Sequence, residues 1–235
     1  MNKYVNFVSD DVFLNCVRKV VEAYKSRDFK PPIELLKNSK NTNDEFKTIF
    51  DIYVNKLSLN KWSRKEIERQ YDKTINNKIG EFHQELLGHV EGWVDLGIGD
   101  KTEIDLKKED NSIFIELKNK HNTMNSSSSK TCREKLENII EEYPNSRAYW
   151  AYIISKNYIS EDCVWKYKDH IYDERIRRIS GDKLYELITG ESDSLEKTLY
   201  AIPRAICDIL GEDHQLSKTD QSILKEYLQD IFNSK

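Results

Sequence analysis

The first third of the chain carries apolar side chains at helical spacing. Across residues 9–25 they recur every three or four positions, and Ser9 stands where its hydroxyl can cap the first turn. The same spacing runs through residues 43–57 and again from about residue 63 to 87. We therefore predict a helical N-terminal section, in which the third helix is either continuous or broken once.

After Gly88 the spacing changes to the alternation of period two that is typical of strands. Gly92, Gly97 and Gly99 punctuate the change. Three short strands are predicted, at residues 92–98, 102–107 and 112–119. Only four residues separate the last two, so these should form a hairpin.

The pattern then returns to helix, and an aromatic and β-branched run follows. A Ser- and Asn-rich stretch, residues 122–129, leads into a helix that Pro144 closes. A buried strand is predicted at 148–155, further strands near 163–167 and 176–179, and helices at the C-terminal end. The fold class is therefore α/β, with a central mixed β-sheet and flanking helices. We expect one domain, 1–235, made of a helical section (1–75), a core (76–180) and C-terminal helices (181–235).

Composition narrows the class of protein. A chain of 235 residues with 38% hydrophobic and 33% charged residues can bury a sizeable core. No basic start followed by an apolar run opens the chain, and nowhere do about 18 apolar residues occur together, so we expect a cytoplasmic protein. The four cysteines form no C-x-x-C pair, and we expect reduced structural thiols.

Net charge and local charge point in different directions. The formal net charge of -4 speaks weakly against a polyanionic partner. Basic residues nevertheless gather in two stretches, which either contact a phosphate backbone or are ordinary solvated side chains. These stretches hold Lys118, Lys120, Lys130, Arg133 and Lys135, and Arg175, Arg177, Arg178 and Lys183.

The predicted hairpin groups two carboxylates and a lysine. Alternation sets Asp105 opposite to its apolar neighbours, and in the next strand it places Glu116 and Lys118 on one face. Asp105, Glu116 and the Leu117 carbonyl could hold a hard cation such as Mg²⁺. Lys118 could then orient a water, its pKa lowered by burial beside the metal. The alternative is a charged, solvated face on an edge hairpin.

Three longer segments resemble a known family. They read I-E-L-K-N-K-H-N-T-M-N-S-S-S-S at 115–129, R-R-I-S-G-D-K-L-Y-E-L-I-T-G at 177–190 and I-G-E-F-H-Q-E-L-L-G at 79–88. Residues 78–190 are thereby similar to a small family of type II restriction endonucleases that cut GGNCC palindromes and belong to the PD-(D/E)XK nuclease superfamily. The resemblance implies a nuclease-like core at 76–180, Mg²⁺-dependent hydrolysis of double-stranded DNA, and a homodimer with one active site for each strand.

The resemblance also implies roles for single residues. Asp105 matches the first acid of the superfamily motif, Glu116 the second and Lys118 the lysine. Ile104 stands where the motif has proline, and Asp95 is a competing first acid one strand earlier. In the helix before the sheet, Glu81 is the expected accessory metal ligand; Glu85 is an alternative, and so is a merely solvated glutamate.

The segment after the second acid is the expected DNA contact. Asn and Ser can hydrogen-bond phosphates and base edges, although here they could also cap the helix beginning near Ser127. The candidates are Lys120, His121, Asn122, Thr123, Asn125 and Ser127. None of the five histidines shows the spacing of a zinc site, so we expect no zinc role for them. A repair or recombination nuclease and a non-catalytic DNA-binding module stay open as alternatives.

Overall fold

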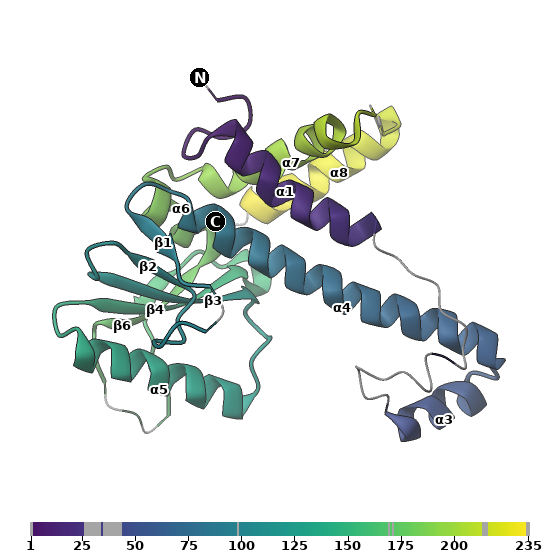
Figure 1. The fold of residues 1–235 in the computed structure, drawn as a ribbon, viewed down its shortest axis with the longest axis horizontal. Coiled ribbons are helices and arrows are strands. Elements are labelled where there is room, and N and C mark those ends of the chain that lie inside the picture. Colours follow the sequence, from purple (N-terminus) through teal and green to yellow (C-terminus); the bar gives the residue numbers. More distant parts are fainter. Residues whose placement is uncertain are drawn as a thin grey trace. The chain divides into compact units, whose positions relative to one another are not determined.

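The computed structural model describes residues 2–25, 34, 44–97, 99–168, 170, 172–212 and 216–233. The chain divides into two compact units, residues 1–19 with 79–235, and residues 20–78. Figure 1 shows the elements in chain order. Asn43, the first residue of the predicted helix 43–57, and Ile98, the last residue of the predicted strand 92–98, lie outside the described residues.

A six-stranded mixed sheet forms the centre of the first unit. Its spatial order is β1 (Trp93–Asp95), β2 (Leu106–Lys108), β3 (Ile113–Lys120), β4 (Arg147–Ile154), β6 (Ile176–Ser180) and β5 (Asp162–Val164). β3, β4 and β6 run parallel, whereas β1, β2 and β5 pair antiparallel with their neighbours. The predicted α/β class and the predicted hairpin, here β2 with β3, are both confirmed.

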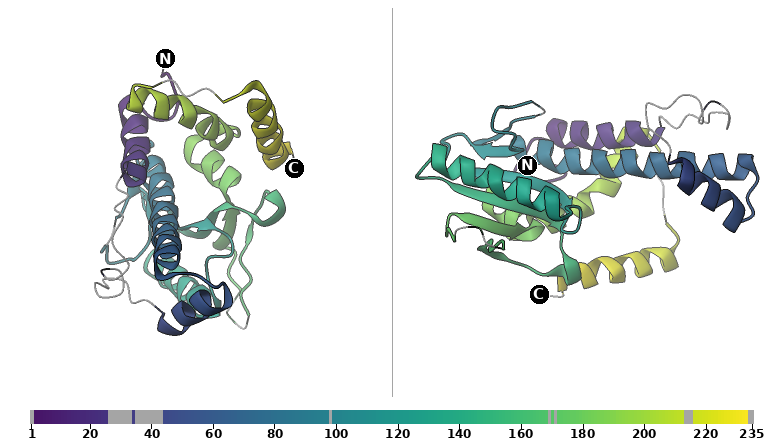
Figure 2. Two further views of the ribbon diagram at one scale, coloured as in Figure 1. Left: turned by 90° about the vertical axis from the view of Figure 1, so that its right-hand side faces the viewer. Right: turned by 90° about the horizontal axis from the view of Figure 1, so that it is seen from below.

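Helix α5 (Ser126–Glu142) covers one face of this sheet (Figure 1 and Figure 2, right). Its buried side chains Leu136 and Ile139 join Phe114 of β3, Ala148 of β4 and Ile176 of β6 in one apolar cluster. Burial of these side chains holds the helix in place, since each fully buried aliphatic or aromatic side chain contributes about 1.5–3 kcal/mol. α5 is also the crossover that the parallel pair β3 and β4 requires.

The opposite face receives the C-terminal end of α4 (Leu59–Gly88) and α6 (Gly181–Thr189). Two glycines permit the close approach. A Cβ on Gly181 would lie 2.4 Å from the carbonyl oxygen of Ile153, and one on Gly88 would lie 2.5 Å from the Asp95 Cβ. Any larger residue at either place would push the helix off the sheet.

The remaining elements of the first unit are helical, apart from the short 3₁₀ turn η1 (Lys156–Tyr158). α1 (Asp10–Lys25) places Phe13 edge-on to Phe82 of α4, with ring centroids 6.4 Å apart. α7 (Ser194–Leu210) and α8 (Lys218–Asn233) follow α6. Among the described residues, no helix has the length and the hydropathy needed to cross a membrane.

The second unit holds the end of α1, α3 (Glu45–Val54) and the first part of α4. Asp44 caps α3 by accepting from the Lys47 N–H at 2.9 Å. Within the unit, Trp62 is buried and the Tyr71 hydroxyl donates to the Tyr24 carbonyl at 2.6 Å. The organisation as one domain stays a prediction.

Of the two forms expected for the third helix, the structure has the continuous one: α4 is one unbroken helix of 30 residues. The structure departs from the expected pattern in the hairpin. The predicted strand 102–107 forms only from Leu106, because the Asp100 carboxylate captures the N–H and the hydroxyl of Thr102 in a turn and Glu103 follows at φ 53°. The backbone before Asp105 is therefore a turn, and strand alternation does not place that residue.

Candidate active site

Asp105 is held at the start of β2 by bonds to both neighbouring strands. Its N–H donates to the Ile115 carbonyl at 3.2 Å, and its carbonyl accepts from the Leu96 N–H at 3.0 Å. Its side-chain Oδ2 accepts from the Leu117 N–H at 2.6 Å. The carboxylate is thus fixed against β3 by a backbone donor that ladder pairing would otherwise use.

Glu116 and Lys118 lie on the face of β3 that also carries Phe114. Glu116 is only 5% exposed, and Lys118 Nζ donates to its Oε1 at 2.7 Å. The same Nζ lies 3.9 Å from Asp105 Oδ2. The structure therefore brings together the three side chains of the predicted D-x(10)-E-x-K set.

The alternative of a solvated face on an edge hairpin is wrong. β3 lies between β2 and β4, so it is an inner strand, and the helix α5 covers the face on which Glu116 lies. A buried carboxylate in such a place is costly unless a cation or donors surround it.

The electrostatics follow from this burial. Burial raises the pKa of Asp105, and the nearby charge of Glu116 raises it further against the opposing effect of Lys118. For Lys118, burial lowers the pKa, but the two carboxylates raise it by more, so its net pKa lies above the ordinary value. The protein groups alone therefore do not lower the pKa of Lys118; the expected lowering would need the charge of a bound cation.

The oxygen donors fit a hard cation. Glu116 Oε2 is buried and has no hydrogen-bond partner among the described residues. Because the Leu117 N–H points toward Asp105, its carbonyl oxygen points to the same edge of β3, as in any strand residue. An orphaned carboxylate oxygen, a second carboxylate and a carbonyl on one edge are the donor types that Mg²⁺ takes.

Gln84 supports the site in a way that the sequence motifs did not indicate. Its Nε2 donates to Asp95 Oδ1 at 2.8 Å and lies 3.4 Å from the Asp105 carbonyl. Asp95 Oδ1 also accepts from the Gly97 N–H at 2.8 Å. Asp95, the competing first acid, is thus engaged by Gln84 and the Gly97 backbone, whereas Asp105 lies beside Lys118. The only sequence signal for Gln84 is its spacing of four residues from both Gly80 and Gly88, which places all three on one face of α4.

The two candidate accessory acids lie on α4. Glu81 is exposed, one turn before Glu85. Glu85 forms an ion pair with Lys19 of α1. Glu81 as a metal ligand stays a prediction.

The predicted DNA-contacting segment follows β3 directly. The His121 N–H donates to the Ile154 carbonyl at 3.0 Å, which keeps the segment beside the end of β4. Lys120, Asn122 and most of the residues up to Ser128 are exposed. Asn125 caps α5, since its Oδ1 accepts from the Ser128 N–H at 2.8 Å, and the Thr123 hydroxyl donates to the Lys120 carbonyl at 2.9 Å. The capping alternative therefore holds for Asn125, and contact with DNA stays a prediction for the whole set.

Several members of the basic stretches are engaged within the protein. Arg133 is buried, and its guanidinium donates to Glu137 and to the Trp165 carbonyl, so it is a structural residue. The other arginines lie in ion pairs, namely Arg175 with Asp173, Arg177 with Asp162 and Arg178 with Glu161.

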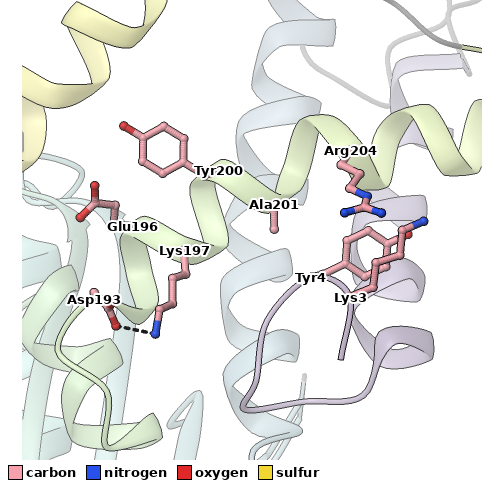
Figure 3. A pocket seen from close by; sticks show the side chains of 8 residues that line it. All are labelled: Lys3, Tyr4, Asp193, Glu196, Lys197, Tyr200, Ala201 and Arg204. Atoms are coloured by element: carbon pink, nitrogen blue, oxygen red, sulfur yellow. Dashed lines mark ion pairs between the residues drawn. The ribbon is translucent and has the colours of Figure 1, made fainter. Parts of the chain in front are cut away.

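A cavity of about 490 Å³ lies apart from these carboxylates, between the N-terminal segment and α7 (Figure 3). It is lined by Lys3, Tyr4, Lys197 and Arg204, with acidic partners close by. Lys197 pairs with Asp193 at 2.8 Å, and Lys3 pairs with Asp208 at 2.5 Å. It contains no member of the Asp105 set.

Comparison with known proteins gives matches over most of the chain. The model of the Eco47II restriction endonuclease family matches residues 5–211. The type II restriction enzyme Sau96I of Staphylococcus aureus is 34% identical over 218 residues, which cover 88% of this chain and 81% of the relative. The type II restriction enzyme Eco47II of Escherichia coli is 32% identical over 221 residues, covering 88% and 89%.

The mixed sheet, the grouping of Asp105, Glu116 and Lys118, and these matches define the class of the protein as a site-specific deoxyribonuclease of the type II restriction kind. Within that class, the chain belongs to the Eco47II restriction endonuclease family.

Proposed function

We propose that this restriction endonuclease hydrolyses phosphodiester bonds of double-stranded DNA at a short palindrome of the GGNCC type, with Mg²⁺ as cofactor. The observation that supports it best is Glu116: a buried carboxylate with one oxygen on Lys118 and the other without a partner among the described residues. A buried carboxylate of this kind is stabilised by a bound cation. The family match supplies the substrate class.

Each residue of the site then has a role. Asp105, Glu116, the Leu117 carbonyl and Glu81 would hold the ion. A bound Mg²⁺ offsets phosphate charge and lowers the pKa of its water. Lys118 Nζ, held 2.7 Å from Glu116 Oε1, is placed to donate a hydrogen bond to the attacking water or to the oxygen on which negative charge develops. The attacking water loses a proton as its oxygen bonds to phosphorus, the bond from phosphorus to the leaving oxygen breaks, and the leaving oxygen takes up a proton from solvent.

The segment after β3 would run along the bound duplex. Its exposed polar side chains lie within a few residues of Lys118, so they would meet the DNA next to the scissile phosphate. The proposed contacts are Lys120, His121, Asn122, Thr123, Asn125 and Ser127.

A palindromic target implies two copies of the chain related by a two-fold axis, each cutting one strand. We therefore propose a homodimer on DNA. A cytoplasmic location remains our prediction.

Two other functions would use the same scaffold. A non-catalytic DNA-binding module is disfavoured, since two carboxylates close to a polyanion repel it unless a cation lies between them. A repair or recombination nuclease is disfavoured by the family match.

The test is digestion of unmethylated plasmid of known sequence with Mg²⁺ or with EDTA, followed by mapping of the ends. We expect discrete Mg²⁺-dependent fragments ending at GGNCC sites, lost in Glu116→Ala and Lys118→Ala. Lys197→Ala is the matched control, because it also removes a lysine from a carboxylate pair, but away from Asp105. Tight binding without cutting would favour the binding module, and cutting only of branched or single-stranded DNA would favour the repair nuclease.

A further inference from the structure

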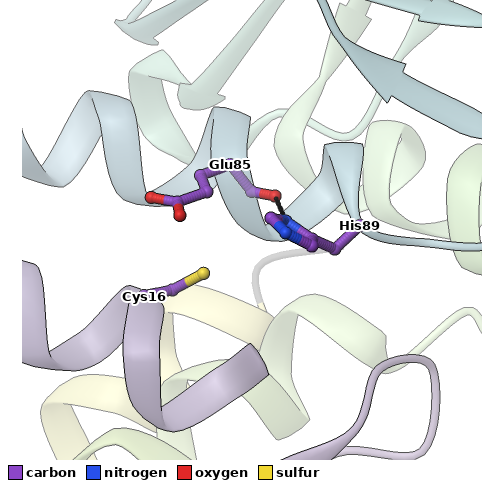
Figure 4. A group of neighbouring side chains, drawn as sticks. All are labelled: Cys16, Glu85 and His89. Atoms are coloured by element: carbon purple, nitrogen blue, oxygen red, sulfur yellow. Dashed lines mark hydrogen bonds between the residues drawn. The ribbon is translucent and has the colours of Figure 1, made fainter. Parts of the chain in front are cut away.

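A second group of potential metal ligands lies between α1 and the C-terminal end of α4. Cys16, Glu85 and His89 each present one ligand atom, and these atoms all lie within 4.8 Å of one another. Figure 4 shows the Cys16 sulfur pointing from α1 toward the side chains of Glu85, on α4, and of His89, just after the end of α4. All three residues belong to the first compact unit.

The hydrogen bond of the histidine determines which of its ring nitrogens can bind a metal. His89 Nδ1 lies 2.7 Å from the Glu85 carbonyl oxygen. A carbonyl only accepts, so Nδ1 carries the proton and Nε2 of the neutral ring keeps its lone pair. Bonds of this kind to the remote ring nitrogen fix the tautomer and orientation of most metal-binding histidines.

The thiol is enclosed and faces polar groups. Cys16 is only 1% exposed, and burial raises its pKa to about 12. In the absence of an ion it is therefore an inert thiol, and binding of a thiophilic ion would exchange the thiol proton for the metal.

A lysine neutralises the Glu85 carboxylate in the absence of a metal ion. Lys19, one turn after Cys16, forms an ion pair with the Glu85 carboxylate, and its side chain is 52% exposed. It can swing into solvent when another cation takes Glu85, at the cost of one exposed ion pair, typically about 0–1 kcal/mol.

We propose that Cys16, Glu85 and His89 bind a single divalent transition-metal ion of the Zn²⁺ class, with water as the fourth ligand. Sulfur and imidazole nitrogen favour such ions, whereas Mg²⁺ prefers oxygen donors, so this site is distinct from that of Asp105 and Glu116. The ion would clip α1 to α4 one residue after Gly88, which lies against Asp95.

This site departs from our expectation of no zinc role for the histidines. Sequence spacing reveals ligands that come from one helix or hairpin. Here Cys16 comes from α1, Glu85 from α4, and His89 from the turn that begins after α4 ends at Gly88.

The test is a titration of EDTA-stripped, reduced protein with Co²⁺ in the presence of excess Mg²⁺. We expect one equivalent to produce a sulfur-to-cobalt charge-transfer band, which only a thiolate-bound ion can give, and Zn²⁺ to displace it. The affinity should fall at least about 100-fold in Cys16→Ser and in His89→Gln, since loss of even an outer partner costs about 10–100-fold. Lys19→Met should bind more tightly, because Glu85 is then released.

Cys207→Ser is the matched control and should leave the band unchanged, since Cys207 lies outside the group. His89 is exposed, so its variant tests the site even if Cys16→Ser folds poorly. Absence of the band in the unaltered protein would overturn the proposal, and so would a band that survives in Cys16→Ser or His89→Gln.

Discussion

At the scale of single residues, the site concentrates negative charge around one lysine. Asp105 and Glu116 approach the same Nζ, at 3.9 Å and 2.7 Å; Glu116 is buried and Asp105 is half-buried. Lys118 thereby has a structural role as well as the proposed chemical one.

Lys118→Met should separate the two roles. Removing the lysine leaves two carboxylates without their cation, which costs about 3–5 kcal/mol in a fully buried pair. Because Lys118 keeps 31% of its side chain exposed, we expect a loss of about 1–3 kcal/mol in the free energy of unfolding. Cleavage should fall about 100- to 10,000-fold.

Urea denaturation with and without millimolar Mg²⁺ measures the structural part. Mg²⁺ should restore stability to Lys118→Met more than it raises that of the unaltered protein. Lys197→Met should change stability by less than about 0.5 kcal/mol. Equal effects of Mg²⁺ on both proteins would contradict metal binding between the two carboxylates.

His83 gives a pH dependence of stability. It is buried against Tyr185, with Nδ1 2.7 Å from the hydroxyl, and burial lowers its pKa from 6.5 to about 4. The unfolded chain therefore binds a proton at a pH where the folded chain does not, so stability is full above pH 6.5 and declines as pH falls toward 4. Between pH 7.5 and 5.5 the loss from this residue should be about 1 kcal/mol.

Comparison of variants isolates that contribution. His83→Gln should unfold with a smaller pH dependence than the unaltered protein across this range, whereas Tyr185→Phe, which keeps the imidazole buried, should retain most of it. Identical pH slopes for the unaltered protein and His83→Gln would show that His83 is not kept neutral by burial.

At the scale of elements, one face of α4 positions the site. Gly80, Gln84 and Gly88 follow at intervals of four residues. Gly80 faces Asn119 of β3, and Gly88 packs closely against Asp95. The Gln84 side chain donates hydrogen bonds to the Asp95 carboxylate and the Asp105 carbonyl. The space available for a new Cβ differs between the two glycines. Substitution of each by alanine therefore gives a matched pair of variants.

Gly88→Ala should destabilise the protein and Gly80→Ala should not. At Gly88 the new Cβ would meet the Asp95 backbone and Cβ at 2.5–3.0 Å, and overpacking of this kind costs about 1–3 kcal/mol. At Gly80 the nearest atom is 3.9 Å away, and alanine favours the helix by up to about 1 kcal/mol. Thermal denaturation measures both effects.

The rate of DNA cleavage should also differ between the two variants. Gly88→Ala moves Asp95 and through it Gln84, so its cutting rate should fall, and that of Gly80→Ala should stay near normal. A drop with Gly80→Ala equal to that with Gly88→Ala would contradict the role of this helix face.

The same elements show what the sequence could and could not predict. Helical spacing located α1, α3 and α5, alternation located β3, and an aromatic and β-branched run located β4. α1 and α5 bury apolar side chains, whereas those of α3 are exposed although their spacing is helical. The spacing of acid, acid and lysine identified side chains that do meet. The start of β2 was missed, because the Asp100 turn is a side-chain effect without periodicity. The Gln84 bonds and the donation from Leu117 to Asp105 depend on how α4 and β3 come together in three dimensions.

At the scale of the whole molecule, the net charge of -4 limits nonspecific attraction to DNA. Several arginines of the basic stretches are paired within the fold, so the exposed segment after β3 is left as the proposed contact. Binding should then depend on both copies engaging one palindrome.

The proposed dimer predicts nicking by mixed molecules. Co-expression of the unaltered chain with a differently tagged Glu116→Gln chain, and isolation of the mixed species, should give a protein that cuts only one strand at each site. Gel analysis of supercoiled plasmid would then show accumulation of the nicked circle. Linear product without a nicked intermediate would contradict one active site per strand.

The most direct test of the central claim is single-turnover cleavage by Glu116→Gln of a short duplex with one GGNCC site, measured together with its affinity for that duplex. Gln keeps the shape of Glu116 but removes the charge that would hold the cation. The account predicts affinity within a few-fold of the unaltered protein, as loss of a carboxylate does not weaken contact with a polyanion, and cleavage slower by at least about 100-fold. Cleavage by Glu116→Gln at nearly the unaltered rate would place the catalytic centre elsewhere.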